Sequence, residues 1–214
     1  MGKSTESTFI VAEAGVNHNG DRDLAFQLVE IAAESGVDAI KFQTFDAEKL
    51  VTRSAPKAAY QQKSTGPSES QLEMLAKLQL DYETHHALKS FSEQKGLHFM
   101  STAFDSESLT FLAYDLELDI LKIPSGEVTN GPLLLEYART GRDLILSTGM
   151  STLDEVRMAL AVLAFGITGA TNPSADGFTV AFQSEEGQKA LSDFGGGQGF
   201  HGGQLRVAAR IAQV

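Results

Sequence analysis

Two lysines lie inside short apolar segments of the chain. Lys41 is part of AIKFQT, and Lys122 is part of DILKIPS. A buried ammonium group is costly unless it is paired, so each lysine either pairs with a carboxylate such as Glu13 or reaches solvent along its aliphatic stem. Two lysines that face one centre repel each other unless an anion lies between them. The pair therefore favours a doubly charged ligand such as a phosphorylated carboxylate.

Three hydroxyl residues follow at the ends of such segments: Thr102 in MSTAF, Ser125 in IPSGE and Ser147 in LSTGM. At the carboxyl ends of strands, hydroxyls and free backbone N–H groups hold phosphate oxygens, although Ser and Thr also simply begin turns. Glu13 and Glu127 lie near the same positions and can either carry out acid–base chemistry or neutralise the two lysines. These residue types predict an anion site with carboxylates beside it.

The histidines give little indication of a metal site. His18 lies in a loop, and a lone histidine is a weak metal signal. His85 and His86 are adjacent on an expected helix, so they point in different directions and cannot chelate one ion together.

A repeated strand–helix pattern, which runs from Phe9 to Gly166, must position these side chains. Short apolar segments predict strands, and the amphipathic segments between them predict helices that pair the strands in parallel. The expected strands are 9–15, 38–44, 97–103, 119–125 and 143–149, and the expected helices are 21–36, 71–80, 81–96, 105–118, 130–141, 151–166 and 184–193.

Local signals mark where several of these helices begin. Asp21 and Asp81 are predicted N-caps, and Pro132 fits a first helical turn. Ser151, with Asp154 three residues later, resembles a capping box.

Side-chain alternation favours a (β/α)8-type barrel over a doubly wound sheet. A doubly wound sheet is apolar on both faces, whereas a barrel carries polar groups at the inner ends of its strands. Polar residues of the expected strands can share one face while their neighbours are apolar: Glu13, Lys41, Thr102, Lys122 and Ser147 against Ile40, Phe42, Leu121 and Ile123. We expect an α/β barrel of which about five of the eight strands are recognisable.

Composition narrows the functional classes. The chain has 214 residues, a net charge of −11 and a pI of about 4.8, which argues against nucleic-acid binding. It has no cysteine, which excludes disulfides and thiolate metal sites. The polar amino terminus lacks a secretion signal, and no segment approaches the roughly 20 apolar residues of a membrane span. We expect a cytoplasmic protein with neither membrane nor nucleic-acid partners.

Five motifs, in this order and spacing, resemble the N-terminal barrel of the sialic acid synthase family: FIVAEAGVNHNGD, AIKFQTF, LHFMSTAFD, LKIPSGE and LILSTGMST. That family includes N-acetylneuraminate synthase and its legionaminate, pseudaminate and spore-coat polysaccharide relatives. The resemblance implies condensation of phosphoenolpyruvate with an N-acetylated hexosamine such as N-acetylmannosamine, giving a nine-carbon 2-keto sugar acid in carbohydrate biosynthesis. It also implies a homodimer and a divalent metal, Mn²⁺ or Mg²⁺, that polarises the sugar aldehyde.

The same resemblance implies roles for individual residues. The implied phosphoenolpyruvate ligands are Lys41, Thr102, Lys122, Ser125 and Ser147. The implied sugar contacts are Gln43 and Glu127. The implied catalytic residues are Glu13, Lys122 and Glu127, with Glu13 supporting proton handling or sugar placement.

The chain departs from the family after Gly166. The family's His-Cys and Ser-Asp-His-Thr motifs, which supply its metal histidines, have no counterpart, and His201 has different neighbours. The ligands of the divalent metal are therefore not expected in this chain. We expect a polar tail at 1–8, a partial synthase barrel at 9–193, and at 194–214 a glycine-rich tail that resembles a truncated or frameshifted reading frame.

Two other interpretations remain open. The first is a different phosphoenolpyruvate-condensing or aldolase-type barrel, which would share the lysines but not the whole series of motifs. The second is a truncated fragment without catalytic activity that retains anion binding at most. Because an incomplete barrel exposes sheet edges and apolar faces, we also expect self-association.

Overall fold

The computed structural model describes residues 8–52, 70–192 and 205–206. The chain divides into two compact units, residues 1–101 and residues 102–214. Residues 53–69, and most of the glycine-rich tail that includes His201, lie outside the described residues.

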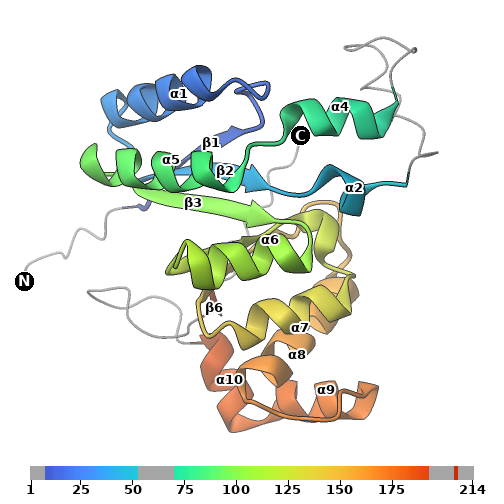
Figure 1. Ribbon diagram of the computed structural model, residues 1–214. Helices are drawn as coiled ribbons and strands as arrows, with labels where there is room; N and C mark the ends of the chain where they lie inside the picture. The colour runs from blue at the N-terminus through green and yellow to red at the C-terminus, as the bar shows by residue number, and fades with distance from the viewer. Residues whose placement is uncertain (1–7, 53–69, 193–204, 207–214) are drawn as a thin grey trace, which may run out of the picture. The chain divides into compact units, whose positions relative to one another are not determined.

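The first unit alternates strands and helices from its amino end (Figure 1). Its elements are β1 (Val11–Gly15), α1 (Arg22–Glu34), β2 (Ala39–Thr44), α2 (Ala47–Leu50), α4 (Gln71–Leu78), α5 (Tyr82–Gln94) and the first part of β3 (His98–Ala103). Strands β1 and β2 pair in parallel, with Glu13 directly opposite Lys41. The register places these two polar residues side by side near the carboxyl end of the pair.

The second unit continues the same alternation. Its elements are α6 (Ser106–Thr110), the π-helical turn η1 (Phe111–Asp115), β4 (Ile120–Ile123), the 3-10 turn η2 (Ser125–Glu127), α7 (Gly131–Arg139), β5 (Asp143–Leu146), α8 (Leu153–Ile167), α9 (Ala175–Gln183), α10 (Glu185–Ser192) and β6 (Leu205–Arg206). All of its strand pairs are parallel, and β4 and β5 share four residue pairs. Strand β3 crosses the boundary between the units, and the strands follow the order β1-β2-β3-β4-β5-β6.

The five expected strands are present, and their parallel pairing confirms the α/β class. Alternation along the strands is also confirmed, because Ile40, Phe42, Leu121 and Ile123 are all buried. Each of these residues has a polar or charged neighbour in its strand, so opposite faces of the strands carry apolar and polar side chains. The apolar face packs into the core beneath the helices.

The helix beginnings confirm most of the local predictions. The carboxylates of Asp21 and Asp81 accept backbone hydrogen bonds at the starts of α1 and α5. Pro132 lies in the first turn of α7, where its missing N–H costs no helical hydrogen bond.

One expectation about local structure was wrong. The capping box of α8 is formed by Thr152 and Glu155, one residue later than the Ser151 and Asp154 pair. In addition, α9 has no counterpart among the expected helices; the Ser174 hydroxyl is its N-cap, and its apolar residues Phe178 and Ala181 are spaced as a helix requires.

Candidate functional site

In the first unit, Lys41 forms an ion pair with Glu13 across β1 and β2. Lys41 is only 9% exposed, so the carboxylate compensates a nearly buried ammonium group. Gln43 lies two residues beyond Lys41 and therefore points to the same face of β2. Of the two alternatives for this lysine, pairing with a carboxylate or reaching solvent, the structure shows the first. Glu13, Lys41 and Gln43 thus lie at one edge of the strand pair.

Gly15 allows the Glu13 carboxylate to lie at that edge. Its φ of +53° is in the left-handed region, and a Cβ added there would lie 3.2 Å from the Glu13 Oε1 and 3.6 Å from the Gln43 Nε2. A larger residue would be strained and would crowd the Glu13 carboxylate. The end of β1 at Gly15 thus lies beside Glu13, for which proton handling was predicted, and Gln43, for which sugar contact was predicted.

In the second unit, Thr102 and Lys122 lie directly opposite each other on β3 and β4. Thr102 is buried, and Lys122 is half-buried. The Lys122 ammonium donates a hydrogen bond to the Ile123 carbonyl at 2.8 Å, so it bends towards the carboxyl end of its strand. The hydroxyl and the cation that were predicted to share a ligand therefore occupy neighbouring positions on one face.

Ser147 and Ser125 border the same strand end. The Ser147 N–H donates to the Ile123 carbonyl at 3.1 Å, the same oxygen that the Lys122 ammonium contacts. Ser125 opens the turn η2, and a Cβ added to Gly149 would lie 3.5 Å from the Ser125 hydroxyl oxygen. Gly149 therefore lies beside the Ser125 hydroxyl, which a Cβ at this position would meet at van der Waals distance.

Glu127, at the end of η2, is oriented by a residue that sequence reasoning missed. The Asn130 side-chain amide donates to the Glu127 carboxylate at 2.7 Å. The other end of the same amide accepts from the Leu133 N–H at 3.3 Å and caps α7. The sequence signal was available, because an asparagine just before Gly-Pro at the start of an expected helix is a typical N-cap.

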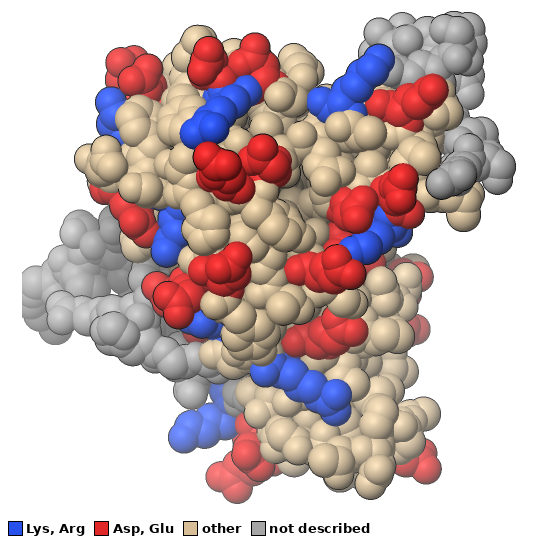
Figure 2. Space-filling view, in the orientation of Figure 1, with Lys and Arg blue, Asp and Glu red and all other residues tan. Residues whose placement is uncertain are grey.

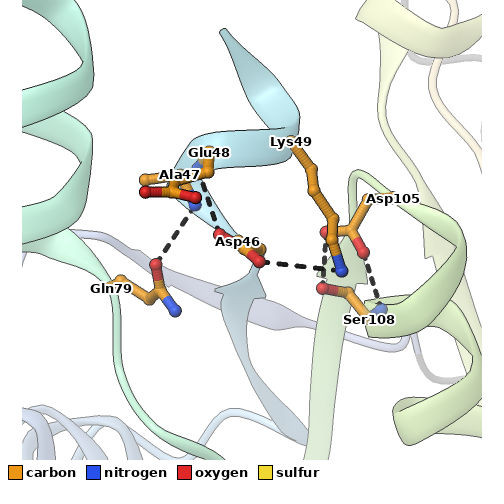
Figure 3. A network of polar contacts seen from close by, with 7 residues as sticks. All are labelled: Asp46, Ala47, Glu48, Lys49, Gln79, Asp105 and Ser108. Carbon is orange, nitrogen blue, oxygen red and sulfur yellow. Dashed lines mark hydrogen bonds and ion pairs between the residues drawn. The ribbon is translucent and has the colours of Figure 1, made fainter. Parts of the chain in front are cut away.

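Short helices fix the loops that follow β2 and β3. Both strands are followed by Phe-Asp, and in each case the aspartate is the N-cap of the next helix. Figure 3 shows Asp46 accepting from the Glu48 N–H at 3.0 Å and pairing with Lys49 at 3.6 Å, while Gln79 accepts from the Ala47 N–H. Asp105, drawn in the same view, binds the backbone N–H and hydroxyl of Ser108. These caps hold the chain immediately after the strands that carry Lys41 and Thr102.

Two buried histidines lie on the apolar side of the first unit. The His85 Nε2 lies 2.9 Å from the Thr44 hydroxyl, which in turn lies 2.7 Å from the Ser101 hydroxyl. The ring of His18 lies against Phe42, and its Nδ1 accepts from the Gly20 N–H at 3.0 Å. As expected, His85 and His86 point in different directions, since His85 is buried and His86 is exposed.

Among residues 8–52, 70–192 and 205–206, no three His, Asp or Glu side chains are grouped as metal ligands would be. The divalent metal that the family resemblance implies stays a prediction.

Parallel strands joined by helices, with polar side chains gathered at the carboxyl ends, define this chain as an α/β protein of the (β/α)8 barrel type. A family model for the NeuB family matches residues 28–189. The chain therefore belongs to the NeuB family, and the resemblance to sialic acid synthases is confirmed.

Individual relatives agree with this assignment. The chain is 50% identical over 158 residues to N,N'-diacetyllegionaminic acid synthase of Campylobacter jejuni, covering 74% of this chain and 47% of that protein. It is 30% identical over 155 residues to human N-acetylneuraminate-9-phosphate synthase, covering 72% and 43%. The crystal structure of N-acetylneuraminic acid synthetase from Leptospira borgpetersenii matches the fold with a TM-score of 0.63 at 28% identity, covering 76% and 52%.

These relatives are longer than the chain. The chain spans about half the length of the two curated relatives named above. The relatives are synthases of sugar acids, so the family is one of biosynthetic enzymes. Within the part of the chain that the structure describes, no helix is long and apolar enough to cross a membrane.

Proposed function

We propose that this chain carries the phosphoenolpyruvate-binding part of a NeuB-family synthase. That synthase condenses phosphoenolpyruvate with an N-acetylated hexosamine, such as N-acetylmannosamine, to a nine-carbon 2-keto sugar acid. The observation that carries the proposal is the pair formed by Thr102 and Lys122, a buried hydroxyl directly opposite a half-buried cation at the ends of parallel strands. The names of the relatives, which are synthases of legionaminic and neuraminic acids, support this class of product.

The second unit offers a set of groups suited to a phosphorylated carboxylate. The ammonium of Lys122 supplies positive charge, and the hydroxyls of Thr102, Ser125 and Ser147 supply donors around it. Charge-assisted hydrogen bonds of this kind are about twice as strong as neutral ones. In the first unit, Lys41 is paired with Glu13, and only the family resemblance implies that Lys41 is a further ligand of phosphoenolpyruvate.

The proposed reaction joins phosphoenolpyruvate to the sugar through a new carbon–carbon bond and releases inorganic phosphate with the uptake of one water. The methylene carbon of phosphoenolpyruvate attacks the aldehyde carbon of the open-chain sugar, and the aldehyde oxygen takes up a proton. Water adds to the carbon that bears phosphate, and inorganic phosphate leaves as the new ketone forms. The family resemblance implies that Glu127, which accepts from Asn130, and Glu13, which pairs with Lys41, bind the sugar or move these protons.

Calorimetric titration with phosphoenolpyruvate tests the proposal. Lys122→Met keeps the length of the side chain and removes its charge, so we expect affinity to fall by about 10-fold to 100-fold, as when a charge-assisted contact of 1.4–2.8 kcal/mol is lost. Lys89→Met removes a lysine on α5 that pairs with Glu93 and is the matched control, for which we expect unchanged affinity. Equal binding by both variants would refute the proposed site, as would a chain that binds no phosphoenolpyruvate.

Several further expectations stay predictions. The choice of sugar, the divalent metal, the homodimer and the cytoplasmic location follow from the family resemblance or from composition. A phosphate-release assay across several N-acetylated hexoses, with the Campylobacter jejuni synthase assayed in parallel, would address the sugar. A chain that binds phosphoenolpyruvate but releases no phosphate would favour the interpretation as an anion-binding fragment.

A further inference from the structure

Tyr137 connects the two strands that carry Thr102 and Lys122. It lies on α7 and is fully buried. Its hydroxyl oxygen accepts from the Ala103 N–H at 3.1 Å and lies 2.8 Å from the Ala103 carbonyl. The same oxygen lies 3.2 Å from the carbonyl of Lys122 itself. One side chain thus reaches the backbone next to Thr102 and the backbone of Lys122.

The Tyr137 hydroxyl both donates and accepts a hydrogen bond. It has one proton to donate and can accept through its lone pairs. Because carbonyls only accept, the proton is directed to the Ala103 carbonyl, the nearer acceptor, with the Lys122 carbonyl as the weaker partner. A phenylalanine at this position would leave the Ala103 N–H without this acceptor in a buried place, which is costly.

This connection joins the backbones of two paired strands. Strands β3 and β4 are parallel, with Thr102 directly opposite Lys122. Beyond Thr102, the Tyr137 hydroxyl binds both backbone groups of Ala103, as a neighbouring strand would otherwise do. The relative position of Thr102 and Lys122 therefore depends on a helix as well as on the sheet.

The hydroxyl also remains a donor over the working pH range. Burial is the main cause that raises the pKa of Tyr137; the Ala103 hydrogen bond lowers it in part, and the negative charges of Glu127 and Asp105 raise it further. The phenol therefore stays protonated, so it does not serve as a base. Its role is geometric.

We propose that Tyr137 is a positioning residue for the anion site, setting the spacing of Thr102 and Lys122 by joining the ends of β3 and β4 through its hydroxyl. The positioning part stands on the geometry alone. The connection to phosphoenolpyruvate rests on the function proposed above. Tyr137 itself is not placed to contact the ligand, because its hydroxyl is occupied by the backbone.

The test compares two variants of α7 in the full chain. Tyr137→Phe removes only the hydroxyl, and Leu134→Val removes a methylene from a buried leucine of the same helix without changing these hydrogen bonds. Denaturant unfolding shows whether the two variants lose similar stability. Affinity for phosphoenolpyruvate is measured by calorimetry, and backbone amide exchange is measured by NMR in the absence of ligand.

For Tyr137→Phe we expect amide exchange to accelerate at least 10-fold at Ala103 and at the end of β4, and affinity to fall about 10-fold. For Leu134→Val we expect amide exchange to accelerate only as far as its loss of global stability requires, and we expect affinity for phosphoenolpyruvate to stay unchanged. Unchanged exchange at Ala103 and β4 in Tyr137→Phe would overturn the positioning role whether or not the chain binds the ligand. Faster exchange together with affinity equal to that of Leu134→Val would overturn the connection to the site.

Two results separate this inference from the proposed function. If the unchanged chain binds no phosphoenolpyruvate, the proposed function fails, and amide exchange still decides whether Tyr137 positions the strand ends. If Tyr137→Phe does not fold, exchange in the unchanged chain is followed during titration with phosphoenolpyruvate. If binding requires the hydrogen bonds of the Tyr137 hydroxyl, bound phosphoenolpyruvate must stabilise them in return and slow exchange of the Ala103 amide. An Ala103 amide whose exchange does not change on binding would overturn the inference.

Discussion

At the scale of single residues, the buried histidines carry a directional chain of hydrogen bonds. The His85 Nδ1 lies 2.9 Å from the Asp81 carbonyl, which can only accept, so Nδ1 carries the proton. The Nε2 then accepts from the Thr44 hydroxyl, and the Thr44 oxygen accepts from Ser101. These hydrogen bonds link α5, β2 and β3 within the first unit.

His18 adds a second neutral ring to the same part of the core. Its Nε2 is buried and has no hydrogen-bond partner among the residues that the structure describes. Burial lowers the pKa of His18, and the proximity of His85 lowers it further. Burial is also the main cause that lowers the pKa of His85. A proton on either ring would place an uncompensated charge in an apolar environment.

These shifts predict that the protein loses stability in mild acid. In the unfolded chain both histidines titrate near their ordinary value of 6.5, whereas the folded chain takes up their protons only at lower pH. Between those values the unfolded state binds more protons, so the free energy of unfolding falls as pH falls, by at most about 1.4 kcal/mol per pH unit for each group. Urea unfolding across the range from about pH 7.5 to about pH 5 measures this slope.

His85→Gln is expected to reduce that pH dependence, although it also lowers stability at neutral pH by disturbing the hydrogen bonds to Thr44 and Asp81. His86→Gln, on the exposed side of the same helix, is the control and should leave the slope unchanged. A slope that is the same in both variants would contradict the assignment of the effect to His85.

At the scale of secondary structure, the close packing of α7 against α8 depends on one glycine. A Cβ added to Gly166 would lie 2.4 Å from the Ala138 Cβ and 3.1 Å from the Leu135 Cδ1. Alanine is the better helix former by about 1 kcal/mol, so propensity and packing make opposite predictions for this position. The methyl group of Ala138 cannot move aside without moving α7, so packing should dominate.

Gly166→Ala is therefore expected to destabilise the protein by about 1–3 kcal/mol in denaturant unfolding. Ala138→Gly in the same chain removes the nearest atom and should recover part of the loss, which a double-mutant cycle would detect as coupling. Gly126→Ala, where an added Cβ meets no atom within 4 Å, is the control and should change stability little. A stabilising Gly166→Ala would show that the helices separate without cost.

At the scale of the whole molecule, charge and exposed apolar surface act in opposite directions. The net charge is −11, and Figure 2 shows Asp and Glu spread widely over the visible face. The second unit exposes large apolar side chains, among them Met150 and Leu153, the latter 72% exposed. Apolar exposure favours association, while the net negative charge keeps copies apart.

We therefore expect self-association that increases with salt, because added ions screen the repulsion between copies but leave apolar attraction intact. Sedimentation velocity at low and high ionic strength measures the change. Replacing both Met150 and Leu153 by serine should reduce association at high salt, whereas Ile31→Ser, an exposed apolar position on α1, should reduce it less. A uniform monomer at both ionic strengths would refute this expectation.

The sequence by itself determined the periodic features of the protein. Alternation along each strand placed Lys41 and Lys122 on the face opposite Phe42 and Ile123, because a strand turns successive side chains to opposite faces whatever lies beyond it. Cap residues such as Asp21 and Asp81 were readable for the same reason, since an N-cap binds backbone within its own helical turn. The family motifs extended these local features to a barrel and a reaction class.

Only the tertiary structure decided which distant residues support those positions. Tyr137 reads as one more residue of an amphipathic helix until the fold brings its hydroxyl to Ala103 and Lys122. His85 likewise depends on contact with Thr44, 41 positions away. No local rule predicts such pairs, because they form when separate helices and strands pack and each buried polar group must find a partner. The chemistry at the strand ends was visible in the sequence, and the means of holding it in place was not.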